Sequence, residues 1–133
     1  MKRLLAPYAE HTYAALRIVV GGMYMCHGLQ KIFGILGGKA VVGDSFMYFG
    51  GLLELVGGAL VAVGLATSLA AFIVSGEMAV AYFKFHASGG LLPIVNHGEP
   101  AVLYCFVFLY MACRGGGRYS IDALLGKRGA SSG

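Results

Sequence analysis

Two glutamates stand inside apolar runs of this sequence. Glu54 lies within residues 50–66, and Glu77 lies within residues 74–86. A charged side chain at the centre of a membrane-spanning helix costs about 2.5 to 3.5 kcal/mol on insertion scales, so an acid there marks a functional site by default. Two such carboxyl groups could share a proton, bind the carbonyl of a quinone or hold a small polar ligand.

The composition is that of a membrane protein. Of the 133 residues, 58% are hydrophobic and 12% are charged, whereas a soluble domain is about 45 to 50% apolar and about 25% charged. The net charge of +4 arises from basic residues gathered near the two chain ends, so we expect no nucleic-acid-binding face. The three cysteines form no C-x-x-C and no zinc spacing, which predicts neither a disulfide framework nor a metal site.

The apolar runs predict the fold. A membrane span needs about 20 mainly apolar residues, and the sequence predicts four spans, at residues 13–36, 46–65, 67–85 and 99–113. We therefore expect an all-α membrane protein, a four-transmembrane-helix antiparallel bundle in which residues 1–133 form one domain. Residues 114–133 are expected to form a tail, with a short interfacial helix at 120–125.

The distribution of positive charge predicts the orientation. Lys39 and Lys84 fall on the side of the two long connections, with Lys31 near its border. The side of the chain ends holds Lys2, Arg3, Arg114, Arg118, Lys127 and Arg128. Because Lys and Arg are more frequent on the cytoplasmic side of membranes, we expect both termini and the tail in the cytoplasm. The basic amino-terminal segment lacks the apolar centre of a signal peptide, so we expect it to be retained.

Helical geometry brings several polar groups to one layer. With a rise of about 1.5 Å per residue, His27, Glu54 and Glu77 lie at similar depths, about 12 Å below the outer boundary, and Cys105 lies near the same level. On the first span, a stripe with a helical period carries Arg17, Tyr24, Lys31 and either His27 or Gly28.

We predict two groups of site residues. The proton-handling or ligand-binding cluster comprises Glu54, Glu77 and His27. Further ligand contacts are expected from Arg17, Lys31, Tyr24 and Cys105.

A purely structural interpretation stays open for each of these groups. Buried Glu–Arg and Glu–His pairs can serve helix association alone. His27 could be a satisfied core histidine, and Arg17 could extend to the cytoplasmic interface. Cys105 fits packing better than redox chemistry, because no paired thiol motif is present. His86 and His97 are too few for a metal site, which needs three or four ligands.

Three blocks of the sequence, residues 16–34, 51–86 and 96–124, resemble the DoxX family of small bacterial inner-membrane proteins. The shared elements, in order, include an Arg, HGLQK, Glu-x-x-GG, GL-x-T, GEM-x-x-AYF-x-x-H, N-x-GE and GGGR-x-S-x-D. The matching positions in this sequence are Arg17, His27, Gly28, Lys31, Glu54, Gly57, Gly58, Glu77, His86, Asn96, Glu99, Gly117, Arg118 and Asp122.

The resemblance implies a four-helix, multi-pass protein of the bacterial inner membrane that is linked to redox chemistry and oxidative stress. It implies an oxidoreductase subunit that works with quinone and with partner proteins of the superoxide dismutase or sulfurtransferase type. The sequence contains no recognisable flavin, haem or iron–sulfur motif, so we expect no covalently bound cofactor and no independent catalysis.

Three functions therefore compete. The first is a redox-linked membrane subunit that binds a quinone or a similar small molecule, and it requires an apolar pocket open to lipid and ending at the acids. The second is a non-enzymatic scaffold or assembly protein, which predicts the absence of a cavity. The third is a small transporter, enlarged by homo-oligomerisation, which requires access from both sides. The ligand, the electron donor, the partner and the oligomeric state stay open.

Overall fold

The computed structural model describes residues 1–131, and within that range the chain is helical with no β-strand, which confirms the all-α class. The helices are α1 (Lys2–Leu5), α2 (Ala9–Phe33), α3 (Ser45–Val63), α4 (Thr67–Ala81), α5 (Pro93–Asn96), α6 (Glu99–Arg114) and α7 (Ile121–Ser131). Short 3₁₀ turns, η1 (Ala6–Tyr8) and η3 (Ala87–Gly89), and a π-helical turn, η2 (Tyr82–His86), complete the elements. Residues 132–133, the end of the predicted tail, lie outside the described residues.

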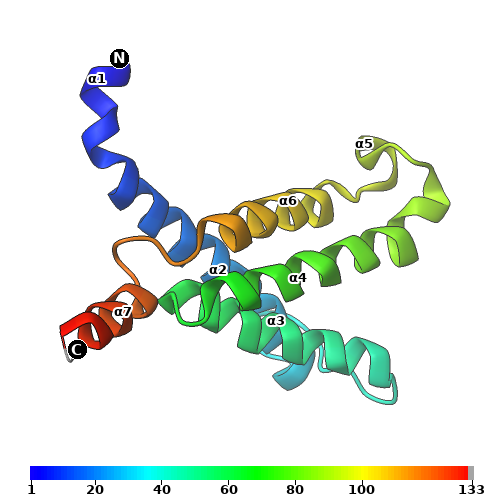
Figure 1. The fold of residues 1–133 in the computed structure, drawn as a ribbon. Helices are drawn as coiled ribbons and strands as arrows, with labels where there is room; N and C mark the ends of the chain where they lie inside the picture. The colour runs from blue at the N-terminus through cyan, green and yellow to red at the C-terminus, as the bar shows by residue number, and fades with distance from the viewer. Residues whose placement is uncertain (132–133) are drawn as a thin grey trace.

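Each of the four long helices runs antiparallel to the long helix before it in the sequence. Helix α2 packs along α3, α4 packs along α6, and a tight turn joins α3 to α4. Both termini and the α3–α4 turn lie at one end of the molecule (Figure 1). The connections 34–44 and 87–98 lie at the opposite end. We call these the terminal end and the loop end.

Glycines in the left-handed backbone conformation end the first two long helices. Gly34 has φ of 66° and Gly64 has φ of 75°, values that suit glycine because it lacks a Cβ. Helix α2 therefore stops at Phe33 and does not reach the predicted boundary at residue 36. Asp44 is the N-cap of α3. Its side chain accepts a hydrogen bond of 3.0 Å from the Met47 backbone nitrogen.

Two helical segments within the described range are long and apolar enough to cross a membrane by length and composition. They are Ser45–Val63 and Thr67–Gly89. Helix α2 has 25 residues but is more polar, and α6 has 16 residues. The outer faces of α4 and α6 are apolar: Phe72 is 64% exposed and Phe106 is 65% exposed. Large exposed apolar surfaces of this kind indicate contact with lipid or with another protein.

Glycines allow α2 and α3 to lie against each other. A Cβ at Gly58 would stand 2.5 Å from the Met25 backbone nitrogen, and one at Gly21 would stand 2.7 Å from that of Ala62. A Cβ at Gly28 would meet the backbone of Leu55 directly. Each helix therefore approaches the other over two turns, as small residues permit in membrane bundles.

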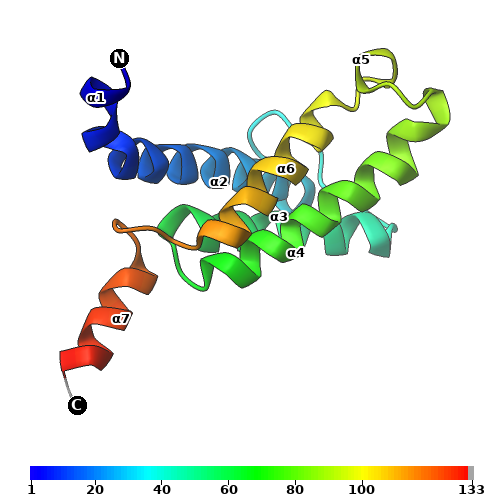
Figure 2. The same ribbon diagram turned by 45° about the horizontal axis from the view of Figure 1, so that its top comes forward.

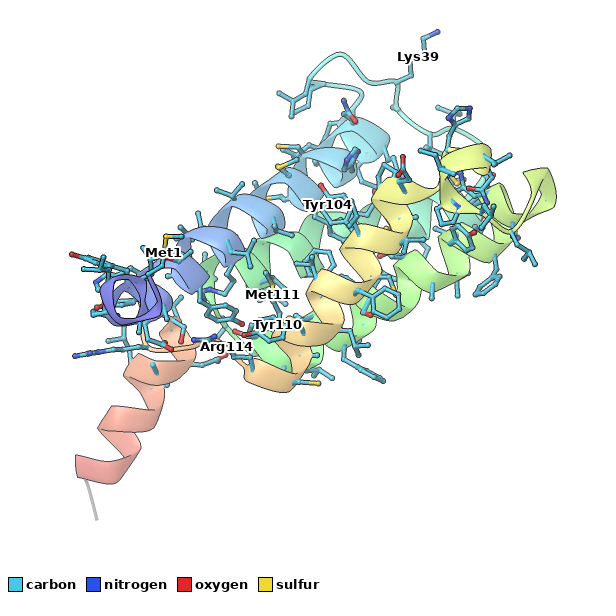
Figure 3. All side chains as sticks on the ribbon, turned by 90° about the horizontal axis from the view of Figure 1, so that it is seen from above. Met1, Lys39, Tyr104, Tyr110, Met111 and Arg114 are labelled. Carbon is cyan, nitrogen blue, oxygen red and sulfur yellow. The ribbon has the colours of Figure 1, made fainter. Side chains whose placement is uncertain are left out.

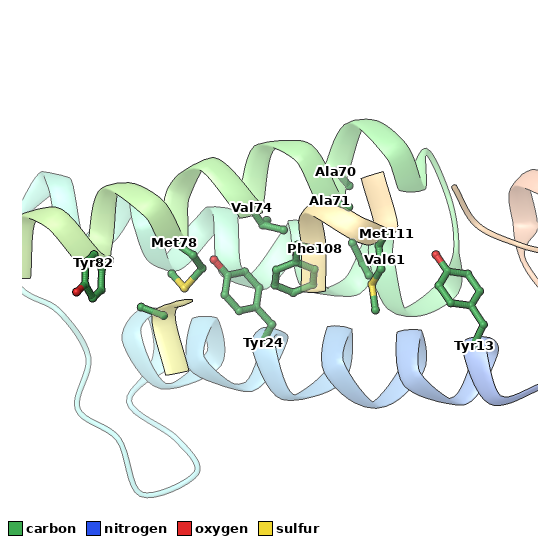
Figure 4. Packing of buried hydrophobic residues seen from close by; sticks show 11 residues of the cluster. Tyr13, Tyr24, Val61, Ala70, Ala71, Val74, Met78, Tyr82, Phe108 and Met111 are labelled. Carbon is green, nitrogen blue, oxygen red and sulfur yellow. The ribbon is translucent and has the colours of Figure 1, made fainter. Parts of the chain in front are cut away.

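Aromatic and aliphatic side chains fill the terminal half of the bundle. Val61, Val74, Phe108 and Met111 are completely buried, and Figure 4 shows them between the helices. The rings of Tyr24 and Phe108 meet edge to face with centroids 4.8 Å apart, a favourable aromatic geometry. This half of the bundle is densely packed.

The tail is fastened to the α3–α4 turn by Asp122. Its carboxylate accepts hydrogen bonds from the backbone nitrogens of Ala66 (2.7 Å) and Thr67 (2.9 Å) and from the Thr67 hydroxyl (2.7 Å). Burial raises the pKa of Asp122, but these hydrogen bonds and the charge of Arg17 outweigh it and hold the pKa below its ordinary value of 3.8. Asp122 thus caps α4, whose own N-cap, Ala66, makes no side-chain bond.

The tail helix is longer than predicted. We expected a helix at 120–125, whereas α7 extends from Ile121 to Ser131 and projects away from the bundle (Figure 2). Its start is held at the bundle because the Asp122 backbone nitrogen donates to the Gly64 carbonyl at 2.8 Å.

The glycine contact yields a test. We expect Gly58→Ala to lower the free energy of unfolding by about 1 to 3 kcal/mol, because the new methyl group would collide with the backbone of Met25. Thermal unfolding in detergent would measure the change. The matched control is Gly76→Ala, since a Cβ at Gly76 meets nothing within 4 Å. Equal stability of the two variants would contradict the close α2–α3 contact.

Candidate functional site

Glu54 forms an ion pair inside the bundle. Its side chain projects from α3 and the residue is 3% exposed. Lys31, near the end of α2, places its Nζ 2.6 Å from Glu54 Oε1. The glycine contact between α2 and α3 brings these two side chains together, since Gly28 lies one helical turn from Lys31. The predicted acid on the second span is therefore paired with the predicted cation on the first.

Glu77 is held by a second group from α2. The Tyr24 hydroxyl donates a hydrogen bond of 2.9 Å to Glu77 Oε2, and Tyr24 is 1% exposed. Figure 4 shows the Tyr24 ring directed from α2 toward α4, with its hydroxyl near Met78. Gly50 of α3 leaves room for the acid, because a Cβ there would stand 3.2 Å from Glu77 Oε1. We call Tyr24, Lys31, Glu54 and Glu77 the polar layer.

A cavity of about 230 Å³ opens between α3 and α4 and reaches this layer. Lys31, Glu54 and Glu77 are its polar lining residues, and its other walls are apolar or aromatic. Those walls are Phe46, Met47, Phe49, Gly50, Leu53, Ile73, Met78, Val80, Ala81 and Phe85. The cavity therefore has an apolar body and a charged end, the usual design of a small-molecule site.

A second cavity, of about 310 Å³, also adjoins the polar layer. It shares Lys31 and Glu54 with the first and also touches Tyr24, His27 and His86. The lining residues of both cavities come from the part of the bundle nearer the loop end, whereas the terminal half is packed. The polar layer is thus approached from one half of the molecule.

His27 lies beside the polar layer and faces outward. It is exposed, whereas its neighbour Gly28 is buried against α3. Its ring centroid is 6.2 Å from that of Tyr104 on α6, and both residues line a groove of about 580 Å³ between α2 and α6. Tyr104 is labelled in Figure 3, between these two helices. Of the two alternatives for the inward stripe, the structure places Gly28 on the inner face.

Arg17 lies apart from the two acids, at the terminal end. It is 1% exposed, and its Nη2 donates a hydrogen bond of 2.6 Å to the Tyr119 carbonyl in the tail. Its guanidinium also packs directly against Gly64. Arg17 therefore contacts the tail and pairs with neither Glu54 nor Glu77.

Cys105 joins α6 to α4 and does not reach the polar layer. The Ser75 hydroxyl donates to the Cys105 carbonyl at 2.8 Å, and its oxygen lies 3.6 Å from the Cys105 sulfur. Over the part of the chain that the structure describes, all three cysteines are free, and no group of three or more His, Cys, Asp and Glu side chains could hold a metal ion.

A hydrogen-bond network at the loop end was not predicted. The Tyr82 hydroxyl donates to the Leu91 carbonyl at 2.6 Å and accepts from Asn96 Nδ2 at 3.1 Å. His86 Nδ1 lies 3.1 Å from the Asn96 carbonyl. These contacts hold the π-helical turn η2, which ends α4 beside both cavities, against the 87–98 connection. The sequence signal for this network is the presence of both AYF-x-x-H and N-x-GE, which contain Tyr82, His86 and Asn96.

Comparison with known proteins identifies the family. The profile of the DoxX family matches residues 12–87. An uncharacterized protein of Haemophilus influenzae is 42% identical over 125 residues, which cover 89% of this chain and 93% of that protein. The chain belongs to the DoxX family. No solved structure matches the chain.

The DoxX motif residues gather at three places in this protein. Lys31, Glu54 and Glu77 form the polar layer. His86 and Asn96 belong to the network at the loop end. A third set, at the terminal end, joins Arg17 to Tyr119 and Asp122 to the α3–α4 turn. Motif residues that are far apart in this sequence therefore lie close together in the fold.

The Lys31–Glu54 pair yields a test by double substitution. Lys31→Met should lower the free energy of unfolding by about 3 kcal/mol, because it leaves the buried Glu54 carboxylate without its counter-ion. The double variant Lys31→Met/Glu54→Gln should recover part of this loss, since it removes both charges. Thermal unfolding in nanodiscs would measure both changes. Strictly additive losses would contradict a direct ion pair.

Proposed function

We propose that this DoxX protein crosses the bacterial inner membrane four times, through α2, α3, α4 with η2, and α6, with both termini in the cytoplasm. Arg114 lies at the terminal end and Lys39 lies at the loop end, as Figure 3 illustrates. The excess of basic residues toward the terminal end supports a cytoplasmic location for that end. Some of these basic residues have side chains that the structure does not describe, namely Lys2, Arg3, Lys127 and Arg128.

We further propose that the polar layer binds a quinone or a similar small molecule, and that the protein serves redox chemistry as a membrane subunit. The observation that carries this proposal is the cavity between α3 and α4, which ends at Lys31, Glu54 and Glu77. Exposed apolar residues at its edge, such as Ile73 and Val80, suit entry from lipid. A flat ring would rest among Phe46, Phe49 and Phe85, and its polar substituents would meet the charged end.

The cavities favour a binding site over a scaffold. A bundle that used its acids only to lock helices together would pack side chains around them, because empty space lowers stability. Here two cavities, of about 230 Å³ and about 310 Å³, are lined by the Glu54–Lys31 pair. The acids are therefore available to a ligand as well as to Lys31 and Tyr24.

The packing also favours a binding site over a transport path. Val61, Phe108 and Met111 are fully buried in the terminal half of the bundle. A permeating ion or solute would have to displace them. Access from the loop half alone fits a ligand that enters and leaves by the same side.

Electron transfer at this site would need a partner. We propose a redox protein of the superoxide dismutase or sulfurtransferase type, as the family resemblance implies, to exchange electrons with the bound quinone. The chain's own residues would bind the ring, orient it and hold protons at Glu54 and Glu77.

A cavity-blocking variant tests the binding site. In lipid nanodiscs we expect saturable binding of a short-chain benzoquinone to the wild type. Binding should weaken about tenfold or more in Ile73→Trp, because the larger side chain would occupy the cavity edge. The matched control is Phe72→Trp, which substitutes an exposed neighbour outside the cavity lining and should bind like the wild type.

Two results would contradict the proposal. Absence of saturable binding to folded wild-type protein would favour the scaffold. Equal affinity of wild type and Ile73→Trp would place the quinone elsewhere.

A further inference from the structure

One carboxylate oxygen in the polar layer lacks a partner. Glu54 Oε1 meets Lys31, but Glu54 Oε2 is buried and accepts no hydrogen bond from any described residue. A buried acceptor without a donor is costly, and more so when it carries charge. Glu54 lines both cavities, so a ligand in either one would lie beside this carboxylate.

The neighbouring donors, Tyr24 and Lys31, form hydrogen bonds with other carboxylate oxygens. The Tyr24 hydroxyl has one hydrogen, and it donates that hydrogen to Glu77 Oε2. Lys31 lines the cavity and donates one hydrogen to Glu54 Oε1, and its ammonium group has further hydrogens to donate. The charged end of the cavity thus offers a ligand acceptors, at Glu54 and Glu77, and a donor, at Lys31.

A hydroxyl group matches this end better than a carbonyl group. A hydroxyl donates one hydrogen bond and accepts others, so it can satisfy a carboxylate oxygen and the Lys31 ammonium together. A carbonyl only accepts, so it would pair with Lys31 and leave Glu54 Oε2 without a donor. A site built to bond a ligand hydroxyl discriminates strongly against an analogue that lacks it.

We propose that the polar layer selects ligands whose ring carries a hydroxyl group, as in a phenol or a quinol, over the corresponding ether or quinone. The proposal rests on the proposed function, because it uses the same cavity. It adds that the reduced form of a quinone couple is the better ligand and that Glu54 is the residue that sets this preference.

Redox-inert probes test the preference. The pair is a para-alkylphenol and its methyl ether, which differ in the hydroxyl hydrogen and one methyl group. In nanodiscs the wild type should bind the phenol about tenfold or more tightly than the ether. In Glu54→Gln the ratio should fall toward one, because the amide oxygen would face the Lys31 ammonium and the amide NH2, a donor, would take the place of Oε2. Glu99→Gln, an exposed carboxyl outside the cavity, is the control and should keep the wild-type ratio.

The outcomes separate this proposal from the proposed function. A benzoquinone and its quinol are measured beside the phenol pair. Equal affinities of the wild type for quinone and quinol, together with a phenol-to-ether affinity ratio near one, would overturn the hydroxyl preference. The binding site itself would then still stand. Failure of all four probes to bind folded wild type would overturn both. The wild-type ratio decides the matter even where Glu54→Gln fails to fold.

Discussion

A carboxylate buried in an apolar bundle needs a partner, and the arrangement of this protein follows from how Glu54 obtains one. Lys31 reaches Glu54 from a different helix, so α2 must lie close enough to α3 for a 2.6 Å contact. Gly21, Gly28 and Gly58 permit that approach because no Cβ separates the two backbones. Tyr24, two turns before Lys31 on the same stripe, then reaches across to Glu77 on α4. One helix face therefore supplies a partner to each acid.

The two halves of the bundle differ for a physical reason. In the terminal half, aromatic and aliphatic side chains fill the interior, and Arg17 and Asp122 fasten the tail to the α3–α4 turn. In the loop half, small residues such as Gly50 and Ala81 stand beside the acids, and cavities remain. Rigid packing at one end holds the helices in register, which allows open space at the other end without loss of the fold. This division fits a binding site that is formed before the ligand arrives.

Much of this arrangement was predictable from local pattern. Apolar runs predicted the long helices, and the helical stripe on the first span predicted that Tyr24 and Lys31 face the acids. The same period could not separate His27 from Gly28, because adjacent residues differ by only about 100° around a helix; the close contact of Gly28 with Leu55 decides it. Nor could it place Arg17, whose partner, Tyr119, lies 102 residues away in a polar tail. The cavities arise from side-chain volumes on α2, α3, α4 and α6, which no single segment reveals.

The proposed function requires a ligand in the space between α3 and α4. The most direct test is photolabelling in nanodiscs with a benzoquinone that carries a diazirine, followed by mass-spectrometric mapping of the labelled peptides. We expect saturable labelling within residues 46–54 and 73–85, the segments of α3, α4 and η2 that line the cavity, and competition by unlabelled quinone. Labelling concentrated instead along the α2–α6 groove, at Val20 or Leu103, would contradict this proposal and would assign the site to the face that carries His27.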